Sequence, residues 1–342
     1  MTSEPTLASP PPWRRALVTG GAGFLGSHLV TRLLDSGVEV DCLDDLSTGR
    51  PENVAPVADR QGFRFLELDV ADPGCPDVLT GPYDLVLHLA GPASPADCRR
   101  RPLETLDAGS LGTRHALAVA ERDGARFLLA SACEACELTG GALGAPCTGD
   151  GHAYADPVDP CGAYAETKRF SEALVAAHAG ARGSNAGIVR VFDTYGPRMR
   201  PDDDRPLSRL LAQAEHGDPV TVAGDGSRTV SLCYVDDAVD GLLRVAAGRS
   251  VRPLDIGGEE QVPLAELARR VIELTGSDAP LQFTDGTVGA PGPHRPDTGF
   301  ARELFGWRPR VSWQEGLERT LAAARPAPTP AIVGAGGSGW LS

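Results

Sequence analysis

The sequence of 342 residues is poor in aromatic residues, at 5%, and contains no apolar run of the roughly 20 residues needed to span a bilayer. Its first residues, MTSEPTLASPPPW, lack the basic and apolar regions of a secretory signal, so we expect a cytoplasmic protein without a membrane segment. Basic residues are also scarce: 32 Lys and Arg stand against 46 Asp and Glu, which gives a net charge of −14. Because phosphates would be repelled without a concentrated basic face, this charge argues against binding to nucleic acid or anionic membranes.

Cysteines with metal-ligand spacing are scarce as well. The eight cysteines are scattered, and several lie inside predicted strands, which is typical of reduced and buried thiols. Cys133 and Cys136 form one C-x-x-C, which could be a redox pair or half of a zinc site. No second C-x-x-C and no spaced pair of histidines completes such a site, so the sequence predicts no bound metal.

The order of apolar and amphipathic segments predicts an α/β fold. Short apolar runs indicate strands at 16–20, 38–44, 63–69, 84–90, 126–132 and 187–192. The segments between them, such as 104–123 and 164–179, carry apolar residues at the i, i+3, i+4 spacing of a helix. Strands separated by helices imply a Rossmann-like, doubly wound parallel sheet.

The stretch ALVTGGAGFLGSHLVTRLLDSG combines a strand, a glycine-rich turn and an amphipathic helix. Gly21, Gly23 and Gly26 fit G-x-G-x-x-G, and Gly20, Gly23 and Gly26 fit the related G-x-x-G-x-x-G. Such glycines let the backbone approach a pyrophosphate, whose charge is favoured by the helix N-terminus. The next strand ends at Asp44, where a carboxylate can bind adenosine ribose hydroxyls and repel a 2′-phosphate. The sequence therefore predicts NAD, rather than NADP, as cofactor.

Two further features extend this prediction. Asp69 and Val70 close the third strand, where an adenine contact would lie, although an aspartate that only forms a turn is the alternative. From about Phe192 the pattern changes to loops, short strands and helices, which indicates a smaller C-terminal α/β lobe for the substrate.

We expect the NAD-binding domain to cover 14–191, with 230–250 returning to it, and the substrate lobe to cover 192–324. The ends, residues 1–13 and 325–342, are rich in Pro, Ala and Gly and are predicted to be disordered tails.

The segment YAETK places Tyr164 and Lys168 one helical turn apart, so both side chains project from the same face. Tyrosine has an ordinary pKa of about 10 and is a poor base at neutral pH, but a nearby ammonium lowers that pKa. The pair can then take a proton from an alcohol while a hydride leaves its carbon. A Tyr/Lys pair at this spacing is often merely exposed on a helix surface and has no function. The glycine-rich NAD-binding motif upstream favours the catalytic interpretation.

Four other segments are more specific: HLAGPASP at 88–95, VFDTYGPRM at 191–199, GDGSRTVSLCYVDDAVDGL at 224–242 and RPDTGFARELFGWRP at 295–309. With them, the sequence from 15 to 324 resembles the UDP-glucuronate decarboxylases (UDP-xylose synthases) of the extended short-chain dehydrogenase/reductases. The resemblance implies a UDP-sugar substrate, tightly held NAD, and oxidation at C4 with Tyr164 as base. The resulting 4-ketone is β to the C6 carboxylate, so carbon dioxide can leave. Reduction of the 4-keto-pentose then gives UDP-xylose.

The resemblance also implies which residues form the site. It assigns the decarboxylation steps to Glu134, with Cys133 beside it, although a carboxylate that merely caps a loop is the alternative. These two join Tyr164 and Lys168 as predicted catalytic residues. The implied cofactor-binding residues are Gly20, Gly23, Phe24, Leu25, Gly26, Asp44, Asp45, Thr48, Asp69, Val70, Leu89, Ala90, Gly91, Thr105, Tyr164 and Lys168. The implied substrate-binding residues are Pro92, Ala132, Asp193, Arg198, Arg205, Arg228, Tyr234, His294 and Arg295.

The sequence departs from the family at several of these positions. Ala132 stands where the family has a threonine whose hydroxyl would bond the C4 oxygen, and Cys133 stands where it has a serine. Val230 replaces an arginine, and Gly109 and Asp193 replace asparagines. We expect weakened reduction at C4, so that some UDP-4-keto-pentose escapes, as suits a specialised sugar or natural-product pathway.

Two other functions stay open at this point. One is a 4-epimerase or 4,6-dehydratase that acts on another nucleotide sugar, and the other is a non-catalytic NAD-binding sensor. The family resemblance also implies a homodimer formed through a four-helix bundle, here from 100–121 and 162–180.

Overall fold

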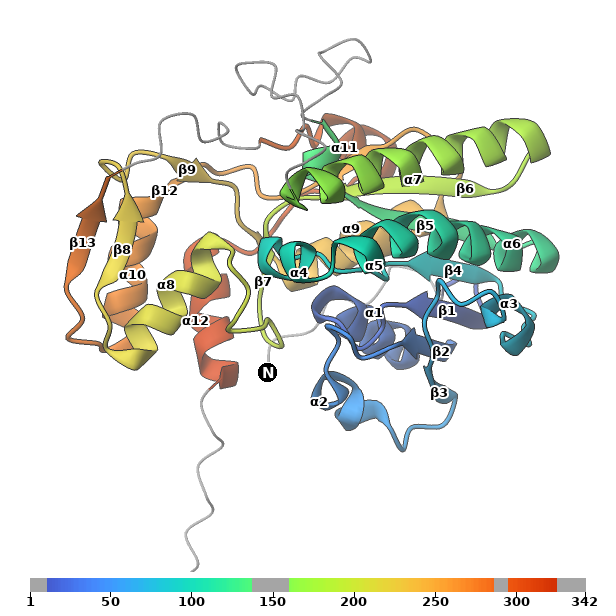
Figure 1. The fold of residues 1–342 in the computed structure, drawn as a ribbon, viewed down its shortest axis with the longest axis horizontal. Helices are drawn as coiled ribbons and strands as arrows, with labels where there is room; N and C mark the ends of the chain where they lie inside the picture. Colours follow the sequence, from blue (N-terminus) through green and yellow to red (C-terminus); the bar gives the residue numbers. More distant parts are fainter. Residues whose placement is uncertain (1–10, 137–159, 286–294, 325–342) are drawn as a thin grey trace, which may run out of the picture.

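The centre of the protein, in a computed structural model that describes residues 11–136, 160–285 and 295–324, is a parallel sheet of seven strands (Figure 1). The strand order is β11-β6-β5-β4-β1-β2-β3, and every neighbouring pair is parallel. The strands are β1 Arg15–Thr19, β2 Glu39–Asp44, β3 Phe63–Glu67, β4 Leu85–His88, β5 Arg126–Ala132, β6 Ala186–Val191 and β11 Leu254–Ile256. The chain order reverses between β1 and β4, which is where such sheets bind their ligands. The predicted doubly wound α/β fold is confirmed.

Helices cover both faces of this sheet. Helices α1 (Phe24–Asp35) and α9 (Val235–Ala247) contact each other on one face. Helices α6 (Thr113–Asp123) and α7 (Pro160–Arg182) contact each other on the opposite face (Figure 1). Helix α9 thus packs on the sheet and β11 extends it, although both follow the start of the second lobe in the sequence.

The sequence of strand β5 is almost continuously apolar, and its place in the centre of the sheet explains why. All seven residues are buried, because helices pack on both faces. Leu128 lies in the core cluster that contains Leu29 of α1, whereas Phe127 and Leu129 lie in the cluster that contains Leu117 of α6.

Short elements connect the strands of the sheet domain. They are α2 Pro51–Val54, η1 Ala55–Val57, α3 Cys75–Val78, α4 Pro95–Arg100, α5 Pro102–Asp107, the π-helix η2 Ala108–Gly112 and the 3-10 helix η3 Cys133–Cys136. The remaining elements are β7 Thr194–Tyr195, α8 Pro206–His216, β8 Val220–Ala223, β9 Thr229–Val230, β10 Cys233–Tyr234, β12 Val262–Pro263, α10 Leu264–Thr275, β13 Leu281–Thr284, α11 Gly299–Phe305 and α12 Trp313–Ala324. Most of these form the smaller lobe, which lies beside the carboxyl edge of the sheet (Figure 1).

Of the two predicted tails, the structure describes only residues 11–13. Trp13, which the sequence prediction places in the N-terminal tail, is buried in the same core cluster as Leu29. Residues 1–10 and 325–342 lie outside the described residues. Across 11–136, 160–285 and 295–324, no helix combines the length and the apolar character that a membrane crossing requires.

Candidate active site

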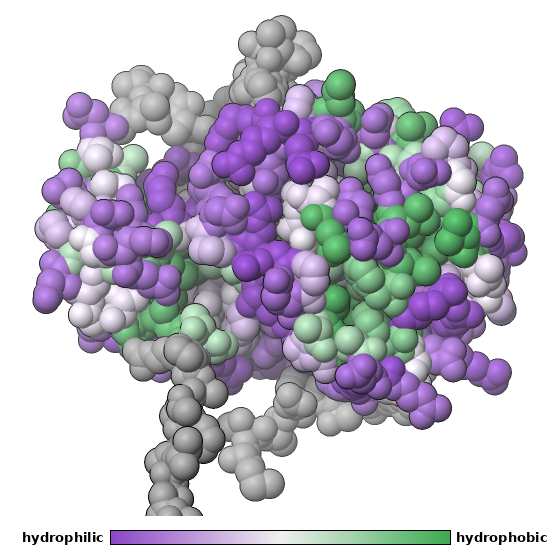
Figure 2. Space-filling model, turned by 60° about the horizontal axis from the view of Figure 1, so that its bottom comes forward, coloured by the Kyte–Doolittle hydropathy of each residue, from purple (hydrophilic) through white to green (hydrophobic). Residues whose placement is uncertain are grey.

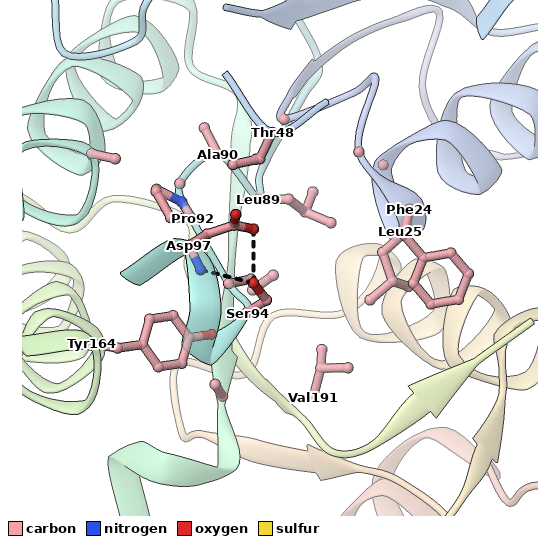
Figure 3. A pocket seen from close by; sticks show the side chains of 18 of the residues that line it. Phe24, Leu25, Thr48, Leu89, Ala90, Pro92, Ser94, Asp97, Tyr164 and Val191 are labelled. Carbon is pink, nitrogen blue, oxygen red and sulfur yellow. Dashed lines mark hydrogen bonds between the residues drawn. The ribbon is translucent and has the colours of Figure 1, made fainter. Parts of the chain in front are cut away.

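A large cavity lies over the carboxyl ends of β1, β2, β4 and β5 and encloses about 1440 Å³ of space, part of it open to solvent. In open α/β sheets, ligands bind in the crevice outside the carboxyl ends of the strands, which is where this cavity lies. Figure 3 shows Phe24 and Leu25 on the side of the cavity opposite Tyr164. The predicted site residues that line it are Gly20, Gly23, Phe24, Leu25, Gly26, Asp44, Asp45, Thr48, Asp69, Val70, Leu89, Ala90, Gly91, Pro92, Ala132, Cys133, Tyr164, Lys168, Asp193 and Arg205.

The glycine-rich turn leaves its backbone open to the cavity. Gly20 has a φ of +70°, and a Cβ added there would lie 2.8 Å from the backbone nitrogen of Ala90. A Cβ on Gly26 would lie 2.1 Å from the carbonyl oxygen of Gly20, so neither position accepts a side chain. Among the described residues, no side chain caps the start of α1, whose N-cap is Gly23. Its first N–H groups are thus available to a diphosphate.

The carboxylate of Asp44 is fixed at the end of β2. Its Oδ2 accepts a hydrogen bond from the backbone N–H of Ala22 at 2.9 Å, and its Oδ1 accepts one from that of Leu46 at 2.9 Å. Burial raises the pKa of Asp44, while these two N–H donors act in the opposite direction. A carboxylate so held beside the turn fits the ribose hydroxyls of a dinucleotide and would repel a 2′-phosphate.

Helix α7 brings Tyr164 and Lys168 to the cavity. The Nζ of Lys168 donates a hydrogen bond to the carbonyl oxygen of Ala130 at 3.0 Å and lies 5.6 Å from the centre of the Tyr164 ring. Tyr164 is only 8% exposed and packs in a small cluster with Cys98 and Ala132. The carbonyl of Ala130 on β5 thereby orients an ammonium beside a buried phenol.

The end of β5 supplies few polar side chains beside this phenol. Ala132 packs in the cluster of Tyr164 and has no hydrogen-bonding group to offer. Cys133 begins η3, is buried and lines the cavity. Glu134 is the next residue of η3; its side chain lies outside the described residues. A sugar oxygen held next to Tyr164 would therefore receive no hydrogen bond from position 132.

Some predicted residues do not line the cavity. Thr105 is buried in α5, where its hydroxyl donates to the carbonyl of Arg101 at 2.7 Å. Arg198, with a φ of +69°, donates a hydrogen bond to the Thr31 hydroxyl at 3.2 Å. Both side chains therefore have partners outside the cavity wall.

Three more predicted substrate residues, Tyr234, Arg228 and Arg295, do not line the cavity. Tyr234 is buried and packs edge-on against Tyr195, with ring centres 5.8 Å apart. Arg228 and Arg295 are exposed, and His294 lies outside the described residues.

The sequence analysis missed a polar group that lines the cavity between the two lobes. The hydroxyl of Ser94 caps α4: it accepts the N–H of Asp97 at 3.1 Å and donates to Oδ2 of Asp97 at 2.8 Å (Figure 3). Arg200, from the second lobe, donates to the same Oδ2 at 2.7 Å. The Ser-Pro-x-Asp pattern of a helix N-terminus could have indicated the cap. Nothing in the sequence could have indicated its partner, because Arg200 is 103 residues away.

Comparisons with known proteins agree with this geometry. The family model for the NAD dependent epimerase/dehydratase family matches residues 16–257. UDP-glucuronic acid decarboxylase 4 of Arabidopsis thaliana is 38% identical over 303 residues, 89% of this chain and 67% of that protein. UDP-glucuronic acid decarboxylase 6 of the same plant is 38% identical over 304 residues, 89% of this chain and 86% of that protein. The chain thus spans about two thirds of the first relative and most of the second.

Solved structures show the same fold. A UDP-glucose 4-epimerase of Thermotoga maritima with UDP-glucose superposes with a TM-score of 0.78 at 27% identity, covering 91% of this chain and 98% of that one. A dTDP-glucose 4,6-dehydratase of Streptomyces venezuelae with bound NAD gives 0.77 at 27% identity, covering 90% and 96%. The chain belongs to the NAD-dependent epimerase/dehydratase family and, within it, to the UDP-glucuronic acid decarboxylase family of the extended short-chain dehydrogenase/reductases.

Proposed function

We propose that the protein is an enzyme that decarboxylates UDP-glucuronic acid with NAD as its cofactor. The observation that carries this proposal is the Tyr164–Lys168 pair, oriented by the Ala130 carbonyl, in the same cavity as the glycine turn and Asp44. The turn and Asp44 fit NAD by their open backbone and fixed carboxylate. Membership of the decarboxylase family supplies the substrate.

The chemistry follows from these residues. When bound, NAD supplies a hydride acceptor and, in its reduced form, a hydride donor. Tyr164, held as phenolate by Lys168, takes the proton of the C4 hydroxyl as C4 is oxidised. The 4-ketone is β to the C6 carboxylate, so the C5–C6 bond breaks, carbon dioxide leaves, and the bonding electrons pass into an enolate. A proton at C5 then gives the 4-keto-pentose, and Tyr164 returns its proton to O4 when C4 is reduced.

We propose that reduction at C4 is the weak step, so that UDP-4-keto-pentose leaves together with UDP-xylose. Each keto-pentose that leaves would keep the hydride on the cofactor as NADH, so NADH would have to exchange for NAD before the next oxidation. The support is the apolar contact of Ala132 with Tyr164. A threonine at this position would instead donate a hydrogen bond to the C4 oxygen. Such a mixed output suits a specialised sugar or natural-product pathway.

The test is an incubation of the purified protein with NAD and each member of a panel of nucleotide sugars. We expect UDP-glucuronic acid alone to lose carbon dioxide, with both a keto and a reduced pentose nucleotide among the products. Tyr164→Phe, which keeps the ring and removes the base, should lose about a hundredfold or more of this activity. Turnover of a neutral hexose nucleotide without carbon dioxide release would instead assign the protein to the epimerases or dehydratases.

We also propose that the active protein is a homodimer formed through α5, α6 and α7. The support is a set of large apolar side chains exposed on α5, on η2 between α5 and α6, and on α7: Leu103 at 70%, Leu106 at 41%, Leu111 at 43% and Phe170 at 53%. Figure 2 shows a broad hydrophobic area on the half of the molecule that contains the sheet. Exposed apolar surface of this kind on a helical face is typical of a subunit interface.

A further inference from the structure

A line of buried side-chain hydrogen bonds crosses the sheet domain from β1 to α7. The Oγ1 of Thr19 lies 2.7 Å from Nδ1 of His88, and Nε2 of His88 lies 3.1 Å from Oγ1 of Thr113. The Thr113 hydroxyl donates to Oγ of Ser171 at 3.4 Å, and that hydroxyl donates to the carbonyl of Gly109 at 2.6 Å. The four side chains are at most 2% exposed, so water does not compete for these bonds.

Counting donors fixes the direction of the line. The single hydroxyl proton of Ser171 is used on a backbone carbonyl, so Ser171 accepts the proton of Thr113. Thr113 can then only accept from His88, which requires the proton of the ring to be on Nε2. Nδ1 is therefore the acceptor, and Thr19 donates to it. The assignment leaves no two donors and no two acceptors facing each other.

One end of this line lies at the cofactor turn. The backbone N–H of Ala90 donates to the Thr19 hydroxyl at 3.3 Å, and Ala90 lines the cavity beside Gly20. The loop of Leu89, Ala90 and Gly91, which also lines the cavity, directly follows His88. Any shift of the His88 ring would thus move the backbone that faces the cofactor.

The other end lies against the catalytic helix. Gly109 belongs to the π-helix η2, and a Cβ added to it would lie 1.8 Å from Cγ2 of Thr167. No side chain fits at position 109. The Ser171 hydroxyl, which donates to the Gly109 carbonyl, also lies 2.9 Å from the carbonyl oxygen of Thr167 on α7. Thr167 and Ser171 follow Tyr164 by three and seven residues and so share its helical face. A π-helix at such a position is common at functional sites.

The ring of His88 is uncharged. Burial is the main cause, and the ammonium of Lys168 the second, that lower its pKa to about 3. The groups that face it from β1 and α6 are the hydroxyls of Thr19 and Thr113. The backbone of Ala108 in η2 also hydrogen-bonds the ring and acts against the lowering of its pKa, and the Phe127 ring lies 6.1 Å away on β5. The positive charge that acts on Tyr164 is that of Lys168. Because the His88 ring is neutral, it does not repel this ammonium.

We propose that His88 is a positioning residue that fixes the cofactor loop after β4 relative to the helix of Tyr164 and Lys168. His88 does not line the cavity, so we assign it no contact with the sugar and no proton transfer. It acts because one ring holds Thr19 at the cofactor turn and Thr113 beside α7 at the same time. The expected effect on kcat rests on the proposed function, whereas the expected effect on NAD affinity does not.

The test compares two variants of Thr113 in the full-length protein. Thr113→Val keeps the shape and removes the hydroxyl, and Thr113→Ser keeps the hydroxyl and removes the methyl group. We expect Thr113→Val to lower kcat and the affinity for NAD by about tenfold each, and to leave the KM for UDP-glucuronic acid within about twofold. Thr113→Ser should stay close to the parent protein. His88→Asn, which keeps an acceptor for Thr19 and loses the bond to Thr113, should resemble Thr113→Val.

Thermal unfolding of each variant, with assays run well below the midpoint, separates positioning from stability. If Thr113→Val lowers only the midpoint, with kcat and NAD affinity unchanged, His88 is structural and the proposal is wrong. Equal losses in Thr113→Ser and Thr113→Val would assign the effect to packing and also overturn it. If the protein releases no carbon dioxide but NAD affinity still separates the two variants, the proposed function fails and the positioning role stands.

Discussion

Replacing Ala132 by threonine should restore a hydrogen bond to the C4 oxygen. Ala132 is 7% exposed and packs with Tyr164 and Cys98, so a hydroxyl at this position would lie at the phenol and be shielded from water. A hydrogen bond to an oxygen that gains charge in the transition state contributes about 1–3 kcal/mol, which is roughly tenfold to a hundredfold in rate. We therefore expect faster C4 reduction and a smaller keto fraction in Ala132→Thr.

The buried cluster also resists added volume. Extra atoms in a packed site cost about 1–3 kcal/mol, a cost that could hide the gain from the hydroxyl. Ala132→Val adds nearly the same volume without a hydroxyl and is the matched control. The ratio of the two variants therefore measures the hydroxyl alone.

The assay is the ratio of reduced to keto pentose nucleotide, determined by mass spectrometry at early times and with protein in excess over substrate. Ala132→Thr should exceed Ala132→Val in the rate of C4 reduction by the factor given above. Equal rates would refute the argument that position 132 limits reduction, whatever the two variants do relative to the parent protein.

Three other predictions concern the cofactor, the pH dependence of stability and the interface. Gly26→Ala would place a Cβ 2.1 Å from the Gly20 carbonyl, so NAD affinity measured by calorimetry should fall about a hundredfold; unchanged affinity would contradict the close approach. Burial raises the pKa of Asp255 to about 6 from its usual value of 3.8. The protonated form is therefore favoured by folding, and this stabilisation is full below about pH 4 and lost as the pH rises through about 6. Over that interval, the free energy of unfolding in urea should fall by about 2–3 kcal/mol less in Asp255→Asn than in the parent protein. An unchanged pH dependence would assign it to other groups. Phe170→Glu should convert a dimer to a monomer in light scattering, whereas Leu304→Glu, at a residue exposed to the same extent on α11, should not; a dimeric Phe170→Glu would move the interface elsewhere.

The sequence predicts the elements whose signal is local. Six strands of the main sheet appear as apolar runs, because helices cover both faces of the sheet. Even β3 at the edge, where no residue is fully buried, carries the apolar Phe63, Phe65 and Leu66. The seventh, β11, escaped because it has three residues, between Pro253 and Gly257, and pairs with β6 about 65 residues earlier in the chain. The helical segment 104–123 was predicted as continuous, and the π-helix η2 that interrupts it has no signature in the spacing of apolar residues.

The same distinction holds for the site. The glycine turn and the Tyr164–Lys168 pair could be predicted, because their geometry depends on neighbours within a few residues. The bond from Asp97 to Arg200 and the line through His88 could not, because they join side chains that only the folded sheet brings together. Arg198, Arg228 and Tyr234 were predicted from motifs that resemble those of the family, and their side chains do not line the cavity.

The central claim is that a phenolate on α7 oxidises C4 of a bound uronate and thereby labilises C6. The most direct measurement follows a heavy-carbon label at C6 of UDP-glucuronic acid with NAD and the purified protein. We predict labelled carbon dioxide in proportion to the pentose nucleotides formed, and its loss in Tyr164→Phe. Pentose-free products that retain the label, or undiminished release by Tyr164→Phe, would contradict the account.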